Sequence, residues 1–171
     1  MFIEPAPRGS LSEEALCELE SQLGFPLPDE YRAWLARTNG AEFPFDREGG
    51  PLTEPVLAGY SYHIDEELYG YRTGGSMHTE LLVAHAYRGD LPMDYLPIMR
   101  LTTGAILIKV TEPRLGSIWH RGESSFTDDG VYLPDTPREG DPDEVADTFG
   151  AFLGMWSIED GPQDSGSSAA S

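Results

Sequence analysis

The sequence predicts an α+β fold: a single domain with a central, mostly antiparallel twisted sheet, flanked by N-terminal helices and a C-terminal helix. Apolar residues recur at helical spacing near both ends of the chain. Between them, short apolar runs follow one another with connections too short for parallel crossovers, which favours antiparallel pairing. The 171 residues, of which 39% are hydrophobic, suffice for one well-buried core.

The first helix is predicted after a Pro- and Gly-rich lead-in that covers residues 1–9. Ser10 is a candidate N-cap, because Glu13 three positions later completes a capping box, and Ser12 competes for the same role. Gly24 is a good C-terminal stop for this helix. The apolar stripe between these ends consists of Leu11, Ala15, Leu16, Leu19 and Leu23.

The second helix is predicted to begin at Pro28, whose fixed φ and missing N–H suit a first helical turn. Asp29 and Glu30 follow it, where carboxylates interact favourably with the helix dipole. Asn39 and Gly40 are expected to end the element. The apolar face of this helix consists of Tyr31, Trp34 and Leu35.

The middle of the chain, residues 42–88, carries mixed signals. Tyrosine and isoleucine alternate with polar residues over residues 60–64, as in a half-buried strand. Residues 77–87 have a helical composition, and we expect a helix there. The apolar run over residues 81–83 also fits a strand core, which is the alternative.

Three strands are predicted in the next part of the chain, and short turns join them. They cover residues 96–99, 105–110 and 117–120. Because side chains alternate along a strand, Ile118 and His120 should lie on one face and Trp119 on the other.

The C-terminal helix is predicted to begin at Asp141 as N-cap, with Pro142 in its first turn. Its apolar stripe consists of Val145, Phe149, Phe152, Leu153 and Trp156. Residues 157–171 lack this periodicity and end in Ser, Gly and Ala, so we expect a disordered tail. The folded domain is therefore predicted to span residues 10–156.

The chain is strongly acidic, with 30 Asp and Glu against 11 Lys and Arg and a formal charge of −19. This charge disfavours nucleic acid and anionic membranes, because their binding depends on Lys and Arg. A basic protein partner would be attracted, although solubility alone is the simpler explanation of the acidity. Self-repulsion between such acidic chains makes a monomer the default expectation.

No segment has the length of a transmembrane helix or the pattern of a secretory signal, so a cytoplasmic location is expected. The single cysteine, Cys17, cannot form an internal disulfide, which fits a reducing compartment. Because no His or Lys lies near Cys17 in the sequence, we expect a packing residue rather than a reactive thiol.

No motif for catalysis, metal binding or cofactor binding is found. The glycines form no phosphate-binding loop, and no nucleophile elbow is present, so no cofactor and no catalytic residue are assigned. An enzyme that pairs His63, His78 or His120 with a neighbouring carboxylate is the less favoured alternative. No metal site is expected from the spacing of the four histidines, His63, His78, His85 and His120.

Acidic clusters and tyrosines outside the helical stripes are the candidates for partner contacts. Carboxylates would attract a basic partner, and tyrosine supplies a large contact area at low entropic cost. The alternatives are solvated loops for the acidic clusters and packing beneath loops for the tyrosines. The candidate partner-binding residues are Asp65, Glu66, Glu67, Tyr69, Tyr71, Asp128 and Asp129.

Four segments occur in an order that resembles the SMI1/KNR4 family of the SUKH superfamily. They are Leu27-Pro28-x-x-Tyr31 with Asn39-Gly40, Tyr95-Leu96-Pro97-Ile98, Gly116-Ser117-Ile118-Trp119, and Thr148-Phe149-x-x-Phe152-Leu153. The resemblance covers both ends of residues 10–156 and implies an SMI1/KNR4-like single domain.

The resemblance also implies a non-catalytic protein-binding function. Bacterial members of the family are implied to act as immunity proteins, each of which binds and neutralises a cognate toxin. For this chain the partner would be a basic toxin, with nucleases as one candidate class. A scaffold or regulatory interaction protein is the alternative, because eukaryotic relatives are implied to act as regulatory hubs.

Overall fold

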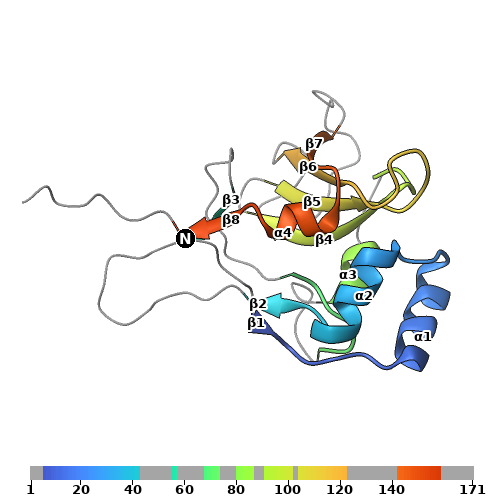
Figure 1. Cartoon of the computed structure of the whole chain (residues 1–171). Coiled ribbons are helices and arrows are strands. Elements are labelled where there is room, and N and C mark those ends of the chain that lie inside the picture. The colour runs from blue at the N-terminus through green and yellow to red at the C-terminus, as the bar shows by residue number, and fades with distance from the viewer. Residues whose placement is uncertain are drawn as a thin grey trace, which may run out of the picture.

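The computed structural model describes residues 6–42, 55–57, 68–73, 80–86, 91–101, 104–122 and 142–158. Its largest sheet is antiparallel and has the strand order β4-β5-β6-β7 (Figure 1). The four strands are β4 (Tyr95–Leu101), β5 (Gly104–Lys109), β6 (Ile118–Gly122) and β7 (Asp143–Ala146). The three strands predicted in this region are confirmed, and β7 is an additional edge strand.

Helices cover one side of this sheet, which confirms the α+β class (Figure 1). α1 (Glu13–Leu23), α2 (Asp29–Thr38) and α3 (Leu81–Ala86) lie on that side. α4 (Phe149–Leu153) follows β7 and contacts α2. α3 confirms the helix expected in this part of the chain over residues 81–86; the predicted strand over residues 60–64 lies outside the described residues.

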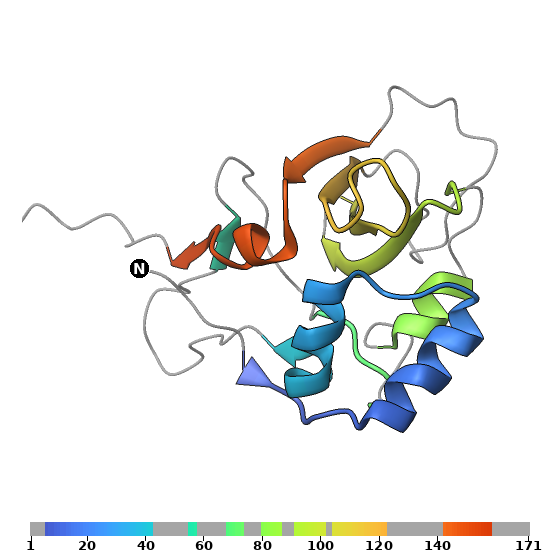
Figure 2. The ribbon, with the colours of Figure 1, turned by 45° about the vertical axis from the view of Figure 1, so that its right-hand side comes forward.

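The structure also contains two small antiparallel sheets of two strands each. β1 (Ala6–Pro7) pairs with β2 (Ala41–Glu42), and β3 (Pro55–Leu57) pairs with β8 (Trp156–Ile158). Residues 6–7 of the lead-in therefore form a strand, and β8 continues two residues beyond the predicted domain boundary. Figure 2 shows α4 and β8 on the side of the molecule away from α1.

The N-cap of α1 is Ser12, the second of the two candidates. Its Oγ accepts a hydrogen bond from the backbone N–H of Ala15 at 3.2 Å. Gly24 ends the helix as predicted, with φ of 87°, a left-handed conformation that glycine adopts at no steric cost. The helix buries Leu16, Leu19 and Leu23.

Replacing Ser12 with alanine is expected to lower the free energy of unfolding by about 1 kcal/mol, because one backbone donor at the helix start loses its acceptor. Chemical denaturation measures this change. The matched control is Ser10→Ala, which removes the same hydroxyl two residues earlier and should leave the stability unchanged. Equal losses in both variants would contradict the assignment of Ser12 as the N-cap.

Hydrogen bonds from the Asn39-Gly40-Ala41 segment connect the end of α2 to residues 68–71, which precede α3 in the sequence. The Asn39 side chain accepts a hydrogen bond from Tyr71 N–H at 2.8 Å and donates one from Nδ2 to the Tyr71 carbonyl oxygen at 3.0 Å. Asn39 and Gly40 both have positive φ, 46° and 84°. Ala41 then pairs with Leu68 through two backbone hydrogen bonds of 3.0 and 3.1 Å. This junction fixes where residues 68–71 enter the core.

The prediction of a C-terminal helix beginning at Asp141 is wrong. Residues 143–146 form β7, which supplies hydrogen-bond partners to the outer edge of β6. The helix begins only after Thr148, whose Oγ1 accepts a hydrogen bond from Ala151 N–H at 3.1 Å. The predicted stripe is nevertheless largely buried, since Phe149, Phe152 and Trp156 are at most 1% exposed.

The expectation that Cys17 is a packing residue is also wrong, because its side chain is exposed on α1. The Sγ atom lies 3.7 Å from Oε1 of Glu13 and 3.8 Å from a terminal nitrogen of Arg32. Arg32 itself forms ion pairs with Glu13 at 2.6 Å and with Glu20 at 3.1 Å. These ion pairs connect α1 to α2 beside the thiol.

Candidate functional site

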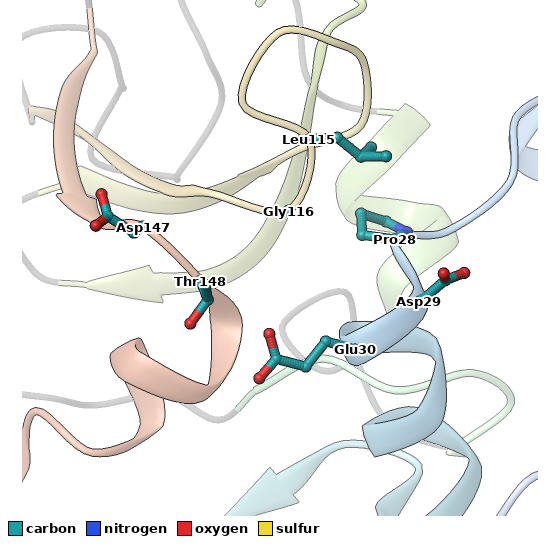
Figure 3. Close-up of a pocket in the computed structure, with 7 residues that line it drawn as sticks. All are labelled: Pro28, Asp29, Glu30, Leu115, Gly116, Asp147 and Thr148. Carbon is teal, nitrogen blue, oxygen red and sulfur yellow. The ribbon is translucent and has the colours of Figure 1, made fainter.

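A groove of about 220 Å³ lies where the start of α2, the loop between β5 and β6, and the residues before α4 meet. Figure 3 shows the side chains that line it. They are Pro28, Asp29, Glu30, Leu115, Gly116, Asp147 and Thr148. We call this site the acidic groove, because three of its seven lining residues carry carboxylates.

The helix start of α2 places Glu30 at the centre of the acidic groove. Figure 3 shows the Glu30 carboxylate directed toward α4. Its Oε1 accepts a hydrogen bond from Gly150 N–H at 3.0 Å. A Cβ atom on Gly150 would collide with this same oxygen, so a glycine is needed for the carboxylate to approach. One oxygen of the Glu30 carboxylate is thus bonded to the first turn of α4.

The loop between β5 and β6 forms a second wall of the acidic groove. Arg114 has φ of 73° and Gly116 has φ of 85°, so the backbone turns sharply on both sides of Leu115. The Arg114 carbonyl oxygen accepts hydrogen bonds from Ser117 N–H at 3.0 Å and from its hydroxyl at 2.6 Å. The Leu115 side chain is 45% exposed at this turn. Hydrogen bonds within the loop thus define its backbone, and the Leu115 side chain is exposed at its turn, beside the groove.

The charges of the acidic groove are only partly neutralised. Arg114, beside the groove, forms ion pairs with Asp147 at 2.7 Å and with Glu144. Within the part of the chain that the structure describes, Asp29 has no ion pair and Oε2 of Glu30 has no hydrogen bond. No Lys or Arg lines the groove. A cationic group entering it would therefore find two carboxylates available.

The chemistry of the acidic groove suits binding of a positive charge. The lining holds one hydroxyl, that of Thr148, whose Oγ1 accepts a hydrogen bond from Ala151 N–H at the start of α4. Among the described residues, no group of three or more His, Cys, Asp or Glu is arranged to hold a metal ion. The carboxylates of the lining suit electrostatic contact with a basic partner.

Two of the seven predicted partner-binding residues, Tyr69 and Tyr71, lie in the described part of the chain. Tyr69 and Tyr71 belong to the hydrophobic core and are 5% and 2% exposed. The Tyr71 hydroxyl accepts a hydrogen bond from Gln22 at 2.9 Å. This placement matches the packing alternative, since neither ring offers a large surface. The other five residues, Asp65, Glu66, Glu67, Asp128 and Asp129, lie outside the described residues.

Two of the four histidines can be placed, and they lie on different elements. His85 on α3 packs edge-on against the Phe25 ring, with the ring centroids 5.6 Å apart. His120 on β6 is only 7% exposed, and its register partner is Asp143. His63 and His78 lie outside the described residues. Burial lowers the pKa of His120 below its usual 6.5, and the Asp143 carboxylate opposes this shift.

The lowered pKa of His120 predicts a pH-dependent contribution to stability. The unfolded chain binds a proton at this histidine more readily than the folded chain, so the contribution is present above about pH 6.5 and declines as the pH falls. We expect the stability difference between the wild type and His120→Gln to shrink from about pH 7.5 to about pH 5. Denaturation at each pH measures it. A difference that is constant over this range would contradict the prediction.

The residues of the acidic groove were not among those predicted to bind a partner. The sequence explains Asp29 and Glu30 by the helix dipole, and it assigns no role to Asp147. The sequence did contain an indication of the groove's location, because three of the segments that resemble the SMI1/KNR4 family each contribute a residue to its lining. Their contributions are Pro28, Gly116 and Thr148.

The described part of the chain is an α+β domain with an acidic groove between α2, the β5–β6 loop and the start of α4. The SMI1 / KNR4 family (SUKH-1) matches residues 10–155, so the chain belongs to this family. No curated protein matches it. Family membership supports a protein-binding role of the immunity or SMI1-like type, and the family is generally non-catalytic. None of the described helices is long and apolar enough to cross a membrane.

Proposed function

We propose that this protein is an immunity protein that binds a cognate basic toxin and blocks its activity in the cytoplasm. The observation that carries the proposal is the acidic groove, because its lining offers the carboxylates of Asp29 and Glu30 to a partner without competing Lys or Arg. The formal charge of −19 extends this complementarity beyond the groove. The protein would act as a monomer that forms a one-to-one complex.

The proposed partner class follows from the charge of the chain. A nuclease toxin engages phosphates through basic side chains, so a strongly acidic protein can approach its active-site cleft quickly and compete with the substrate. More than half of the Asp and Glu residues lie outside the described ranges. We propose that Asp65, Glu66, Glu67, Asp128 and Asp129 add to the attraction, with the acidic groove as the point of close contact.

Co-expression with the products of adjacent genes tests this function. The expected result is that one such product stops growth, that this protein restores it, and that the two co-purify. The complex should weaken from low to high salt, because screening shortens the range of charge interactions to about 10 Å at 0.1 M ionic strength. A toxic neighbour that is neither bound nor neutralised would contradict the proposal, and so would a complex insensitive to salt.

A further inference from the structure

The size of the acidic groove limits what can occupy it. Pockets for drug-sized ligands and cofactors usually measure about 300–1,000 Å³, and this groove measures about 220 Å³. A nucleotide would also bring phosphates beside three carboxylates, at a high electrostatic cost. The volume and the charge together favour a single long cationic side chain from another protein.

The walls of the acidic groove differ in polarity in a way that matches such a side chain. Pro28 and Leu115 form an apolar wall, and the Pro28 ring is close to Gly116, whose missing Cβ would lie 3.6 Å from it. Figure 3 shows Glu30 in the middle of the groove, with Asp29 and Asp147 toward opposite ends. Arginine packs its aliphatic stem on apolar surface while its guanidinium bonds to carboxylate oxygens.

The carboxylate at the centre is held in position before any partner arrives. Gly150 N–H fixes Oε1 of Glu30 at 3.0 Å, which leaves Oε2 as an acceptor. Arg114, beside the groove, already forms an ion pair with Asp147 at 2.7 Å, so this carboxylate is neutralised by the chain's own guanidinium. An incoming charge is therefore directed to Glu30 and Asp29 rather than to Asp147.

We infer that the acidic groove binds one arginine side chain of the basic partner, with its guanidinium on Glu30 and its stem against Pro28 and Leu115. The inference rests on the proposed function, since it identifies the group through which that partner is anchored. Arginine is among the residues that most often dominate binding energy at protein interfaces. Gly150 is a positioning residue in this account, because its lack of a Cβ atom allows Glu30 its place.

The test uses the full chain and the probe N-acetyl-arginine methylamide, with amide chemical shifts as the readout. The neutral isostere N-acetyl-citrulline methylamide is the matched probe. We expect the arginine probe to shift the amides of Glu30, Gly116 and Gly150, and the citrulline probe to bind about tenfold more weakly. Equal binding of the two probes, shifts confined to other regions, or no binding would overturn the inference.

Three variants distinguish the effect of the Glu30 carboxylate at its particular position from the effect of the total charge of the protein. Glu30→Gln should weaken binding of the arginine probe about tenfold. Gly150→Ala keeps every charge but displaces the end of the flexible Glu30 side chain, so it should weaken binding with little effect on folding. Glu14→Gln is the control, because Glu14 also stands in the first turn of a helix. Equal binding by Gly150→Ala and the wild type, or equal weakening by Glu14→Gln and Glu30→Gln, would overturn the inference.

The outcome of this test is distinguishable from that of the proposed function. If toxin neutralisation is observed and the arginine probe does not bind in the groove, the immunity function stands and the arginine inference is wrong. If the probe binds at Glu30 and no toxin is neutralised, the groove recognises arginine and the immunity function is wrong.

Discussion

Replacing Phe149 with alanine is expected to lower the free energy of unfolding by about 3–5 kcal/mol. Phe149 is 1% exposed and stands at the centre of the aromatic contacts between α2 and α4. Its ring centroid lies 4.9 Å from that of Tyr31, 5.0 Å from that of Trp34 and 6.1 Å from that of Phe152. Removing the ring leaves a cavity where α4 packs against α2, and the residues at the starts of these two helices form two sides of the acidic groove.

Chemical denaturation measures this loss, and thermal unfolding should show a decrease of about 2–4 °C for each kcal/mol in a chain of this size. Phe149→Leu is the matched control, because it keeps most of the buried volume and should cost much less. A loss below about 1 kcal/mol in Phe149→Ala would contradict the described packing of α4 against α2.

Replacing Gly40 with alanine is expected to lower the free energy of unfolding by about 2–5 kcal/mol, through two separate effects. The left-handed conformation, with φ of 84°, costs an L-residue about 1–2 kcal/mol. The new Cβ atom would also lie 2.7 Å from the Leu68 carbonyl oxygen and 2.9 Å from Gly70 N, and such overpacking adds about 1–3 kcal/mol. Neither neighbour can move without disturbing the junction made by Asn39.

Gly24→Ala is a control that separates these two effects. Gly24 has nearly the same φ, 87°, but a Cβ atom there would meet nothing within 4 Å. It should therefore show only the conformational cost of about 1–2 kcal/mol. Equal losses in Gly24→Ala and Gly40→Ala would contradict the close approach of Gly40 to residues 68–70.

Much of the fold could be predicted from local sequence signals. Gly24 and Asn39 end their helices as expected. Both adopt the left-handed conformation, which glycine and asparagine favour at a helix C-terminus whatever their tertiary surroundings. The start of the last helix could not be predicted in this way. Pro142 and the acidic residues after it suit a helix start, but the open edge of β6 binds this segment as β7, which is a tertiary effect.

The candidate site was less predictable than the fold, because it is formed by segments far apart in the sequence. Asp29 and Glu30 have an adequate local explanation at the start of α2. Their second role becomes visible only when Gly150, 120 residues after Glu30, donates its N–H to Oε1 of Glu30. Similarly, no local pattern indicates that Tyr69 and Tyr71 are buried, because their hydrogen-bond partners are distant in the sequence. Tyr71 N–H donates to the Asn39 side chain, and Tyr69 N–H donates to the Ile98 carbonyl oxygen.

The affinity of the cognate toxin for charge-reversed variants tests the central claim, that the acidic groove is the partner-binding site, most directly. Glu30→Lys should weaken toxin binding about 100-fold and abolish growth rescue, because a repulsive charge then occupies the anchor position. Glu14→Lys changes the net charge by the same amount at an exposed position of α1 and should have a small effect. If both variants bind the toxin equally well, the acidic groove is not the site of contact.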